Sequence, residues 1–246
     1  MSKSERVILV SGSNGGIGAD VVEYLFECGH RNIACQHRSS PDRIGRVLEK
    51  LGLDPARHLF QGDLRDENYL VRLQRDISEK LGDVAVIINL VGGSTNGLSW
   101  KLSLDDFNNV MAANLTTTFL TCRQFISGMR EKAFGRIINV TSVVAFKGVA
   151  GAAHYCAAKA GIIGLTKALS LELANRNITA NTLALGYFDT GMINQVPDEV
   201  QQKIKGDIPL GRFGAAREVA ACINYLVGDD AGYVTGQVFH INGGLF

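Results

Sequence analysis

The sequence predicts an α/β protein in which a doubly wound parallel sheet of about seven strands carries helices on both faces. Short, apolar and often β-branched runs recur along the chain, and amphipathic segments of helical length separate them. Several of these runs end directly at glycine, as the run 6–11 does at Gly12. The 246 residues contain no repeat, low-complexity segment or change of composition, so we expect one domain over residues 1–246.

The first half of the chain alternates predicted strands with predicted helices. Its strand-like runs are apolar without alternation, which is typical of strands buried on both faces. The helical runs instead place apolar side chains on one face, as Leu70, Leu73 and Ile77 do. Strands are predicted at 6–11, 32–36, 58–61 and 84–90, and helices after Gly18 and over 42–51 and 67–81.

The second half continues this pattern. Ser103 is the expected N-cap of a long helical region that reaches Met129, because Asp105 and Asp106 follow it in the first turn. A second long helix is expected to contain Tyr155 and to end at about residue 174. The remaining predicted strands are 136–140, 178–184 and 237–241, and the remaining predicted helix is 218–227.

The stretch 186–212 follows a predicted strand and is less regular. A solvated loop would not need its many apolar side chains, so we expect a lid that closes over an acyl chain and excludes water. Packing on the domain or on a neighbouring subunit is the alternative. The apolar residues in question are Met192, Ile193, Val196, Ile204 and Ile208.

A glycine-rich turn joins the first predicted strand to the first predicted helix. It reads Gly12-Ser-Asn-Gly-Gly16-Ile-Gly18, and this order points backbone N–H groups and a helix N-terminus at a pyrophosphate. No Gly-Lys-Ser/Thr follows, so the turn is not a P-loop. We therefore predict dinucleotide binding, with a merely tight turn as the alternative.

The residues after the second strand favour NADP over NAD. An NAD site places an acidic residue there to hold the ribose hydroxyls, and none appears before Asp42. Arg38 instead offers a guanidinium suited to a 2′-phosphate, although it would also suit a loop in water. Asp63, at the end of the third strand, is expected either to accept from the adenine amino group or to cap the next helix.

Tyr155 and Lys159 are spaced to lie on one face of a helix. An ammonium beside a phenol favours the phenolate and so lowers the phenol pKa from about 10. With Ser142 the pair would move a proton on or off a carbonyl or alcohol oxygen. A solvated helix face is the alternative for the pair. Asn89 is expected to bridge neighbouring strands, with a place in the cofactor floor as the alternative, and Asn114 is either a satisfied core amide or the holder of a water near Tyr155.

Composition excludes several other functions. A net charge of +1 with 20% charged residues provides no field for nucleic acid or membranes. The five cysteines form no Cys-x-x-Cys and are odd in number, so we expect a reducing compartment, no disulfide framework and no metal site. No signal peptide or spanning segment is found, and we expect a cytoplasmic protein.

Taken together, these motifs resemble the short-chain dehydrogenase/reductase family over essentially the whole chain. The signature comprises Gly12-x-x-x-Gly16-Ile-Gly18, Asp63, Asn89-x-x-Gly92, Asn114, Ser142 and Tyr155-x-x-x-Lys159. Within the family the stretches 138–144, 155–164 and 235–244 most resemble 3-oxoacyl-[acyl-carrier-protein] reductases of fatty acid biosynthesis. The resemblance implies a Rossmann-like domain, a homotetramer and NADPH-dependent reduction of a 3-oxoacyl thioester.

The resemblance also implies roles for individual residues. Tyr155 would donate the proton, Ser142 would orient the substrate and Asn114 would anchor a proton-relay water. Lys159 would lower the pKa of Tyr155 and hold the nicotinamide ribose. The expected cofactor contacts are Gly12, Ser13, Asn14, Gly16, Ile17, Gly18, Arg38, Asp63, Leu64, Asn89, Tyr155, Lys159, Phe188 and Thr190.

Several positions depart from the family pattern and leave the substrate open. Gly15 stands where many NADP-using members carry a basic residue, and Leu90-Val91 and Leu185 replace the usual residues before Gly92 and Gly186. Carrier-protein docking is expected near Lys132 and Arg176, but Ala133 occupies one of the two arginine positions. Another ketone or secondary alcohol, cyclic or linked to CoA, is therefore the alternative substrate, and a non-catalytic NADP-binding regulator is a further one.

Overall fold

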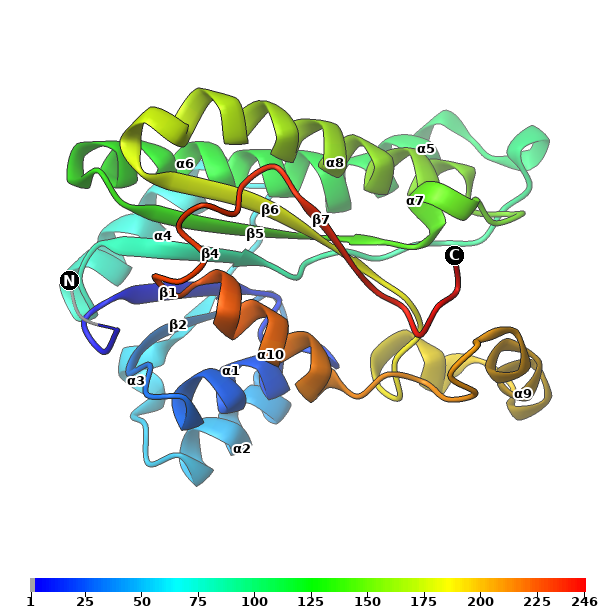
Figure 1. The fold of residues 1–246 in the computed structure, drawn as a ribbon, viewed down its shortest axis with the longest axis horizontal. Coiled ribbons are helices and arrows are strands. Elements are labelled where there is room, and N and C mark those ends of the chain that lie inside the picture. The colour runs from blue at the N-terminus through cyan, green and yellow to red at the C-terminus, as the bar shows by residue number, and fades with distance from the viewer. Residues whose placement is uncertain (1–2) are drawn as a thin grey trace.

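The computed structural model, which describes residues 3–246, confirms the predicted fold class. All strands pair in parallel in one seven-stranded sheet of order β3-β2-β1-β4-β5-β6-β7 (Figure 1). The strands are β1 (Val7–Ser11), β2 (Asn32–His37), β3 (Leu59–Gln61), β4 (Val84–Asn89), β5 (Gly135–Ser142), β6 (Ile178–Leu185) and β7 (Val238–Ile241).

Helices cover both faces of the sheet and bury two separate apolar cores (Figure 1). Successive side chains of β1 alternate between them, since Ile8 and Val10 enter one core while Val7 and Leu9 enter the other. The first core is covered by α1 (Gly18–Glu27), α2 (Asp42–Lys50) and α10 (Ala216–Leu226). The second is covered by α4 (Glu67–Lys80), α6 (Thr117–Lys132) and α8 (Ala153–Leu173).

The shorter helices lie in the connections. They are α3 (Pro55–His58), α5 (Leu104–Met111), α7 (Val144–Lys147) and α9 (Asp198–Asp207). Ser103 is the N-cap of α5, as predicted, and its side chain accepts from the Asp106 N–H. Between α5 and α6 the segment Ala112–Thr116 forms a wider π-helical turn.

The structure differs from the sequence prediction in two connections. His58 belongs to α3 rather than to a strand, and β3 begins at Leu59. The stretch 186–212 contains α9, which was not predicted because none of its residues is buried and apolar periodicity is therefore absent. Its signals are polar ones: Asp198 and Glu199 in the first turn and Lys205 in the last.

The strand order reverses between β1 and β4, because the chain first moves outward from β1 to β2 and β3 and then returns to the other side of β1 at β4. This reversal is the topological switch point of the sheet. In such sheets ligands bind outside the carboxyl ends of the strands at this point. Beyond the same ends lies α9 (Figure 1), whose segment has a small core of its own formed by Ile193, Ile208 and Phe213. Among residues 3–246 no helix has the length and apolarity to cross a bilayer.

Candidate active site

Two adjoining cavities open at the carboxyl ends of the strands. One, of about 430 Å³, lies over β2, β3 and β4 and is lined by Arg38 and Asp63. The other, of about 400 Å³, lies over β5 and β6 and is lined by Ser142, Tyr155 and Lys159. Both are also lined by Gly12, Gly15, Leu90 and Gly92, so together they form one elongated site across the glycine turn.

The glycine turn fits a pyrophosphate. The Gly15 N–H donates to the Gly12 carbonyl over 3.0 Å, and Gly12 has a φ of 69°, which favours glycine. The N-cap position of α1 is Ile17, whose side chain makes no capping hydrogen bond. Ile17 and Gly18 line the cavity over β5 and β6, so the N-terminus of this helix faces the site, as anion binding requires.

The larger cavity carries more positive than negative charge. Arg38 and Arg65 line it with a single carboxylate, Asp63. The Arg65 guanidinium binds both oxygens of Asp63 over 2.5–3.1 Å, and these hydrogen bonds lower the pKa of Asp63 to about 2. The predicted capping alternative for Asp63 is wrong, because Asp66 caps α4 by accepting from the Asn68 N–H.

The end of β2 supplies no carboxylate to this cavity. Gln36 and His37 are buried and bind backbone groups: the Gln36 amide donates to the Gly62 carbonyl over 2.7 Å, and His37 Nδ1 lies 2.6 Å from the Ser39 carbonyl. Arg38 is the first exposed side chain after the strand. A phosphate on the adenosine ribose would therefore meet a guanidinium there rather than a repelling carboxylate.

Tyr155 and Lys159 project from α8 toward the end of β5. The Lys159 Nζ lies 5.6 Å from the centroid of the Tyr155 ring and donates to the Val140 carbonyl over 3.1 Å. Lys159 is only 3% exposed, and burial lowers the pKa of its ammonium to about 8. The Thr141 hydroxyl also donates to the Lys159 carbonyl over 2.6 Å, which fastens this helix to the strand.

The pKa of Tyr155 shifts in the direction opposite to the sequence prediction. Burial raises it to about 12, the charge of Cys156 adds to the rise, and only a hydrogen bond with Ser142 lowers it. The prediction weighed the nearby ammonium but not the desolvation of the phenol. The Tyr155 hydroxyl therefore keeps its proton at neutral pH.

Asn114 lies beside this pair in the π-helical turn. Its amide Nδ2 donates to the Gly93 and Val110 carbonyls, both over 2.8 Å, whereas its buried Oδ1 has no hydrogen-bond partner. A Cβ at Gly92 would lie 2.5 Å from this Oδ1 and 2.9 Å from the Lys159 Nζ. The two polar atoms thus converge beside the Gly92 backbone, where only glycine leaves room for them.

Known proteins that are similar to this chain include reductases. A family model described as enoyl-(acyl carrier protein) reductase matches residues 12–246. The 3-oxoacyl-[acyl-carrier-protein] reductase FabG of Aquifex aeolicus is 36% identical over 243 residues, which cover 98% of this chain and 97% of that protein. This chain belongs to the short-chain dehydrogenase/reductase family.

Other proteins similar to this short-chain dehydrogenase/reductase are not named 3-oxoacyl-[acyl-carrier-protein] reductase. Nodulation protein G of a Rhizobium species is 36% identical over 240 residues, covering 98% of this chain and 96% of the relative. Acetoacetyl-CoA reductase of Rhizobium meliloti is 35% identical over 242 residues, covering 98% of each chain. The protein is accordingly an oxidoreductase that acts on CH–OH and C=O groups with NAD(P)(H).

Most of the predicted site residues of this short-chain dehydrogenase/reductase line the two cavities. Phe188 and Thr190 lie in the smaller one, as does Leu185, the last residue of β6. Three predicted residues are buried and line neither cavity: Ser13, Asn89 and Asn114. The lining residues that were predicted are Gly12, Asn14, Gly16, Ile17, Gly18, Arg38, Asp63, Leu64, Ser142, Tyr155, Lys159, Phe188 and Thr190.

Asn89 acts as the structural bridge that the sequence favoured. Its amide donates to the Asn139 Oδ1 over 2.8 Å, and its own Oδ1 accepts from the Ser11 hydroxyl over 3.3 Å. The Asn139 amide donates in turn to the Thr166 hydroxyl over 2.9 Å. This relay ties β1, β4, β5 and α8 together directly beneath the site.

Two residues of the site were missed from the sequence. Arg65 binds Asp63, and Arg43 at the start of α2 binds Thr190 in the segment after β6. Arg65 lies only two positions from Asp63, so an acid–base pair in the loop was the available signal. No local signal in the sequence indicated the contact of Arg43, because 147 positions separate it from Thr190.

Proposed function

We propose that this protein is an NADPH-dependent ketoreductase that acts on a 3-oxoacyl thioester. The observation that carries the proposal is the group of Ser142, Tyr155 and Lys159 at one end of a dinucleotide-sized site, with Lys159 buried and the other two half-buried. The identity to 3-oxoacyl-[acyl-carrier-protein] reductases over nearly the whole chain supports the substrate class. The larger cavity, over β2, β3 and β4, would hold the adenine half of the cofactor and is called the adenine-side cavity below. It is lined by Arg38 and Arg65 and receives no carboxylate from the end of β2, which supports NADP(H).

The residues at the smaller cavity have the properties that carbonyl reduction requires. When bound, the nicotinamide supplies the hydride. Tyr155, whose pKa is raised to about 12, stays protonated at neutral pH and can donate to the oxygen as negative charge develops on it. Ser142 lines the same cavity as Tyr155 and would hold the carbonyl oxygen beside the phenol.

Lys159 and Asn114 would restore the proton that Tyr155 gives up. The Lys159 ammonium is held by the Val140 carbonyl, and its pKa of about 8 allows it to release a proton near neutral pH. The unpartnered Asn114 Oδ1 supplies an acceptor next to it, suited to one bound water. These two groups would lead a proton to Tyr155 from the interior side of the site.

A homotetramer is part of the proposal. Large apolar side chains are exposed on the elements from which the family builds its subunit contacts, which are the helices of Asn114 and Tyr155 and the C-terminal strand. Leu104 of α5 is 73% exposed and Leu171 of α8 is 83% exposed. Beside β7 the rings of Phe146, His240 and Phe246 pack on one another with centroids 4.8–5.1 Å apart.

Reduction of a CoA-linked 3-oxoacyl group is the second candidate, and one observation favours it. Lys132, at the expected carrier-protein docking position, is paired with Asp83 over 2.6 Å, and its neighbour Ala133 replaces an arginine. Arg176 is exposed but stands without the second arginine of the family pattern. A non-catalytic NADP-binding regulator would not need the four polar residues at the smaller cavity. A cytoplasmic role in fatty acid biosynthesis follows if the carrier-linked substrate is correct.

The test is NADPH oxidation with one 3-oxoacyl group presented on acyl carrier protein, on CoA and as a simple ketone. We expect the highest kcat/KM with the carrier-linked group. Preference for CoA would select the second candidate, and turnover of the free ketone alone would reject thioester recognition. No turnover with any ketone, while NADPH still binds, would reject the reductase and support the regulator.

A further inference from the structure

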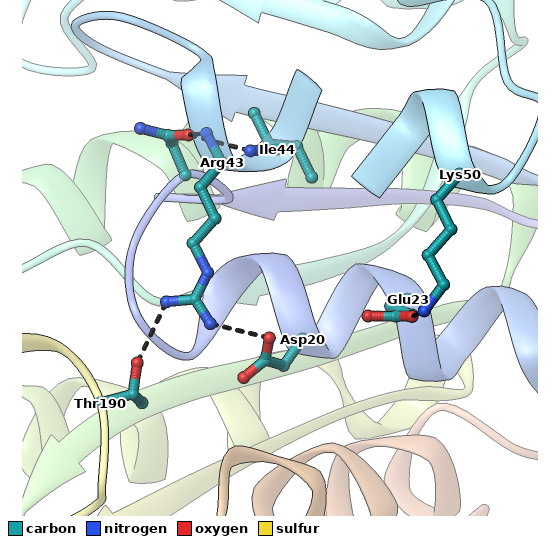
Figure 2. Close-up of polar contacts among 7 residues, drawn as sticks. Asp20, Glu23, Arg43, Ile44, Lys50 and Thr190 are labelled. Carbon is teal, nitrogen blue, oxygen red and sulfur yellow. Dashed lines mark hydrogen bonds and ion pairs between the residues drawn. The ribbon is translucent and has the colours of Figure 1, made fainter. Parts of the chain in front are cut away.

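Arg43 joins three parts of the site that are far apart in sequence. Figure 2 shows its guanidinium lying between α1 and the segment after β6. Nη1 donates to the Thr190 hydroxyl over 3.0 Å, and Nη2 donates to the Asp20 carboxylate over 2.8 Å. The side chain is 35% exposed, so it is neither a core residue nor a freely solvated one.

The backbone around Arg43 is held by the glycine turn. The side-chain Oδ1 of Asn14 accepts from the N–H groups of Arg43 and Ile44 over 2.9 and 3.0 Å. Asn14 Nδ2 donates to the Ser40 carbonyl over 2.8 Å. Pro41, the N-cap position of α2, provides no side-chain cap of its own. Asn14 therefore caps α2 from another loop and fixes the segment 38–43 against the glycine turn.

The acceptor of Arg43 belongs to the start of the expected lid. A Cβ at Gly16 would lie 2.6 Å from the Gly191 N and 2.7 Å from the Thr190 Oγ1, so this part of the lid rests directly on the glycine turn. Thr190 and Ile193 line the cavity that contains Tyr155. Arg38 and Ser39, at the other end of the segment 38–43, line the adenine-side cavity.

We propose that Arg43 is a positioning residue that fastens the start of the lid to the adenine-side segment 38–43, so that occupation of the adenine-side cavity stabilises the closed lid. A ligand that binds Arg38 and Ser39 restrains this segment, and the restraint reaches Thr190 through Arg43. Because such coupling is reciprocal, a closed lid also tightens binding of the adenine half. The coupling between cofactor binding and the lid rests on the proposed NADP(H) function. The restraint of the lid by the contact between Arg43 and Thr190 does not.

The first experiment measures the fastening without any ligand. Trypsin cleavage after Lys203, an exposed lysine of α9, reports opening of the lid. Arg43→Met is expected to raise the cleavage rate about fivefold, equivalent to about 1 kcal/mol. Lys50→Met is the matched control, because it removes another ion pair between α2 and α1, with Glu23, that does not touch the lid (Figure 2).

Two further variants separate the lid contact from the stability of α2. Thr190→Val removes only the hydroxyl acceptor, and adding Arg43→Met to it should produce little further increase in cleavage. Arg43→Lys keeps the charge and should restore part of the protection. Wild-type cleavage rates in both Arg43→Met and Thr190→Val would overturn the fastening, as would an equal rise in Lys50→Met.

The second experiment uses adenosine 2′,5′-bisphosphate, which carries the adenine half alone and cannot reach the lid. Saturation should slow cleavage of wild type and Lys50→Met about fivefold and leave Arg43→Met unchanged. Equal protection of all three, or protection of none despite binding measured by calorimetry, would overturn the coupling. Failure of the compound to bind would instead reject the NADP assignment, and 5′-AMP, the matching half of NAD, then replaces it with the same deciding outcomes.

Discussion

Adding one methyl group at Gly92 should disable the site while leaving the fold intact. In Gly92→Ala the new Cβ would meet the Asn114 Oδ1 at 2.5 Å and the Lys159 Nζ at 2.9 Å. Both side chains are buried and hydrogen-bonded, so neither can move away freely. Ordinary contact begins at 3.4 Å, so the Asn114 Oδ1 must move by about 0.9 Å and the Lys159 Nζ by about 0.5 Å.

A displacement of that size has a predictable kinetic effect. Misplacement of catalytic groups by about 1 Å costs about 100-fold in rate, which corresponds to nearly 3 kcal/mol in the barrier. Overpacking of the interior costs about 1–3 kcal/mol of folding stability, or several degrees of Tm for a chain of this size. We therefore expect kcat/KM for ketone reduction to fall about 100-fold while circular dichroism and NADPH binding report a folded protein.

The neighbouring residue provides the matched control. A Cβ at Gly93 would meet no atom within 4 Å, and neither Gly92 nor Gly93 has a left-handed φ. Gly93→Ala should therefore keep nearly the full kcat/KM. Loss of activity that is equal in the two variants, or a Gly92→Ala enzyme with at least about a third of wild-type kcat/KM, would refute the convergence of Asn114 and Lys159 as the cause.

Three other variants test the remaining roles. Tyr155→Phe should lower kcat about 10²–10⁴-fold with NADPH affinity unchanged, and retention of a tenth or more of wild-type kcat would remove Tyr155 as the proton donor. The unmodified enzyme should prefer NADPH over NADH at least about tenfold in kcat/KM, or 1.4 kcal/mol, and Arg38→Asp should abolish or reverse this preference; equal use of both cofactors by the unmodified enzyme would contradict a role for Arg38. Lys159→Met should abolish turnover but raise Tm at pH 7, because a pKa lowered from 10.5 to about 8 means that burying the ammonium costs on the order of 2–3 kcal/mol at that pH. That cost disappears between pH 8 and 10.5 as wild-type Lys159 loses its proton, so the two Tm values should converge there, and a gap that stays constant over this range would show that the charge is not its source.

The fold and most of the site were predictable because local patterns define them. Buried parallel strands are apolar without alternation and end at glycine, so β1, β4 and their turns are visible in sequence. Tyr155 and Lys159 were placed together by helical spacing alone, and the structure confirms this. Asn89 was recognisable as a bridge because an amide in so apolar a strand needs buried partners.

Other features depend on partners that no local pattern reveals. The cap of α2 comes from Asn14, and the partner of Arg43 is Thr190, each supplied by a distant loop. The raised pKa of Tyr155 depends on how deeply the assembled chain buries the phenol, which a count of nearby charges does not give. The helix α9 escaped prediction because none of its residues is fully buried and only a few apolar side chains, such as Ile204, mark its packed side.

The segment 186–212, which is the proposed lid, has an apolar core that is separate from both sheet cores. Ile193, Ile208 and Phe213 form its centre, with Val196 and Ile204 packed against them, while Tyr155 and Lys159 are rooted in helix α8 against the sheet. Mutations in the lid core can therefore accumulate without altering the packing that holds the proton-transfer residues. We expect substitutions in this segment to change the substrate range of the proposed reductase while Tyr155 and Lys159 keep their places. A library confined to the lid core is accordingly the shortest route to altered substrate choice in this enzyme.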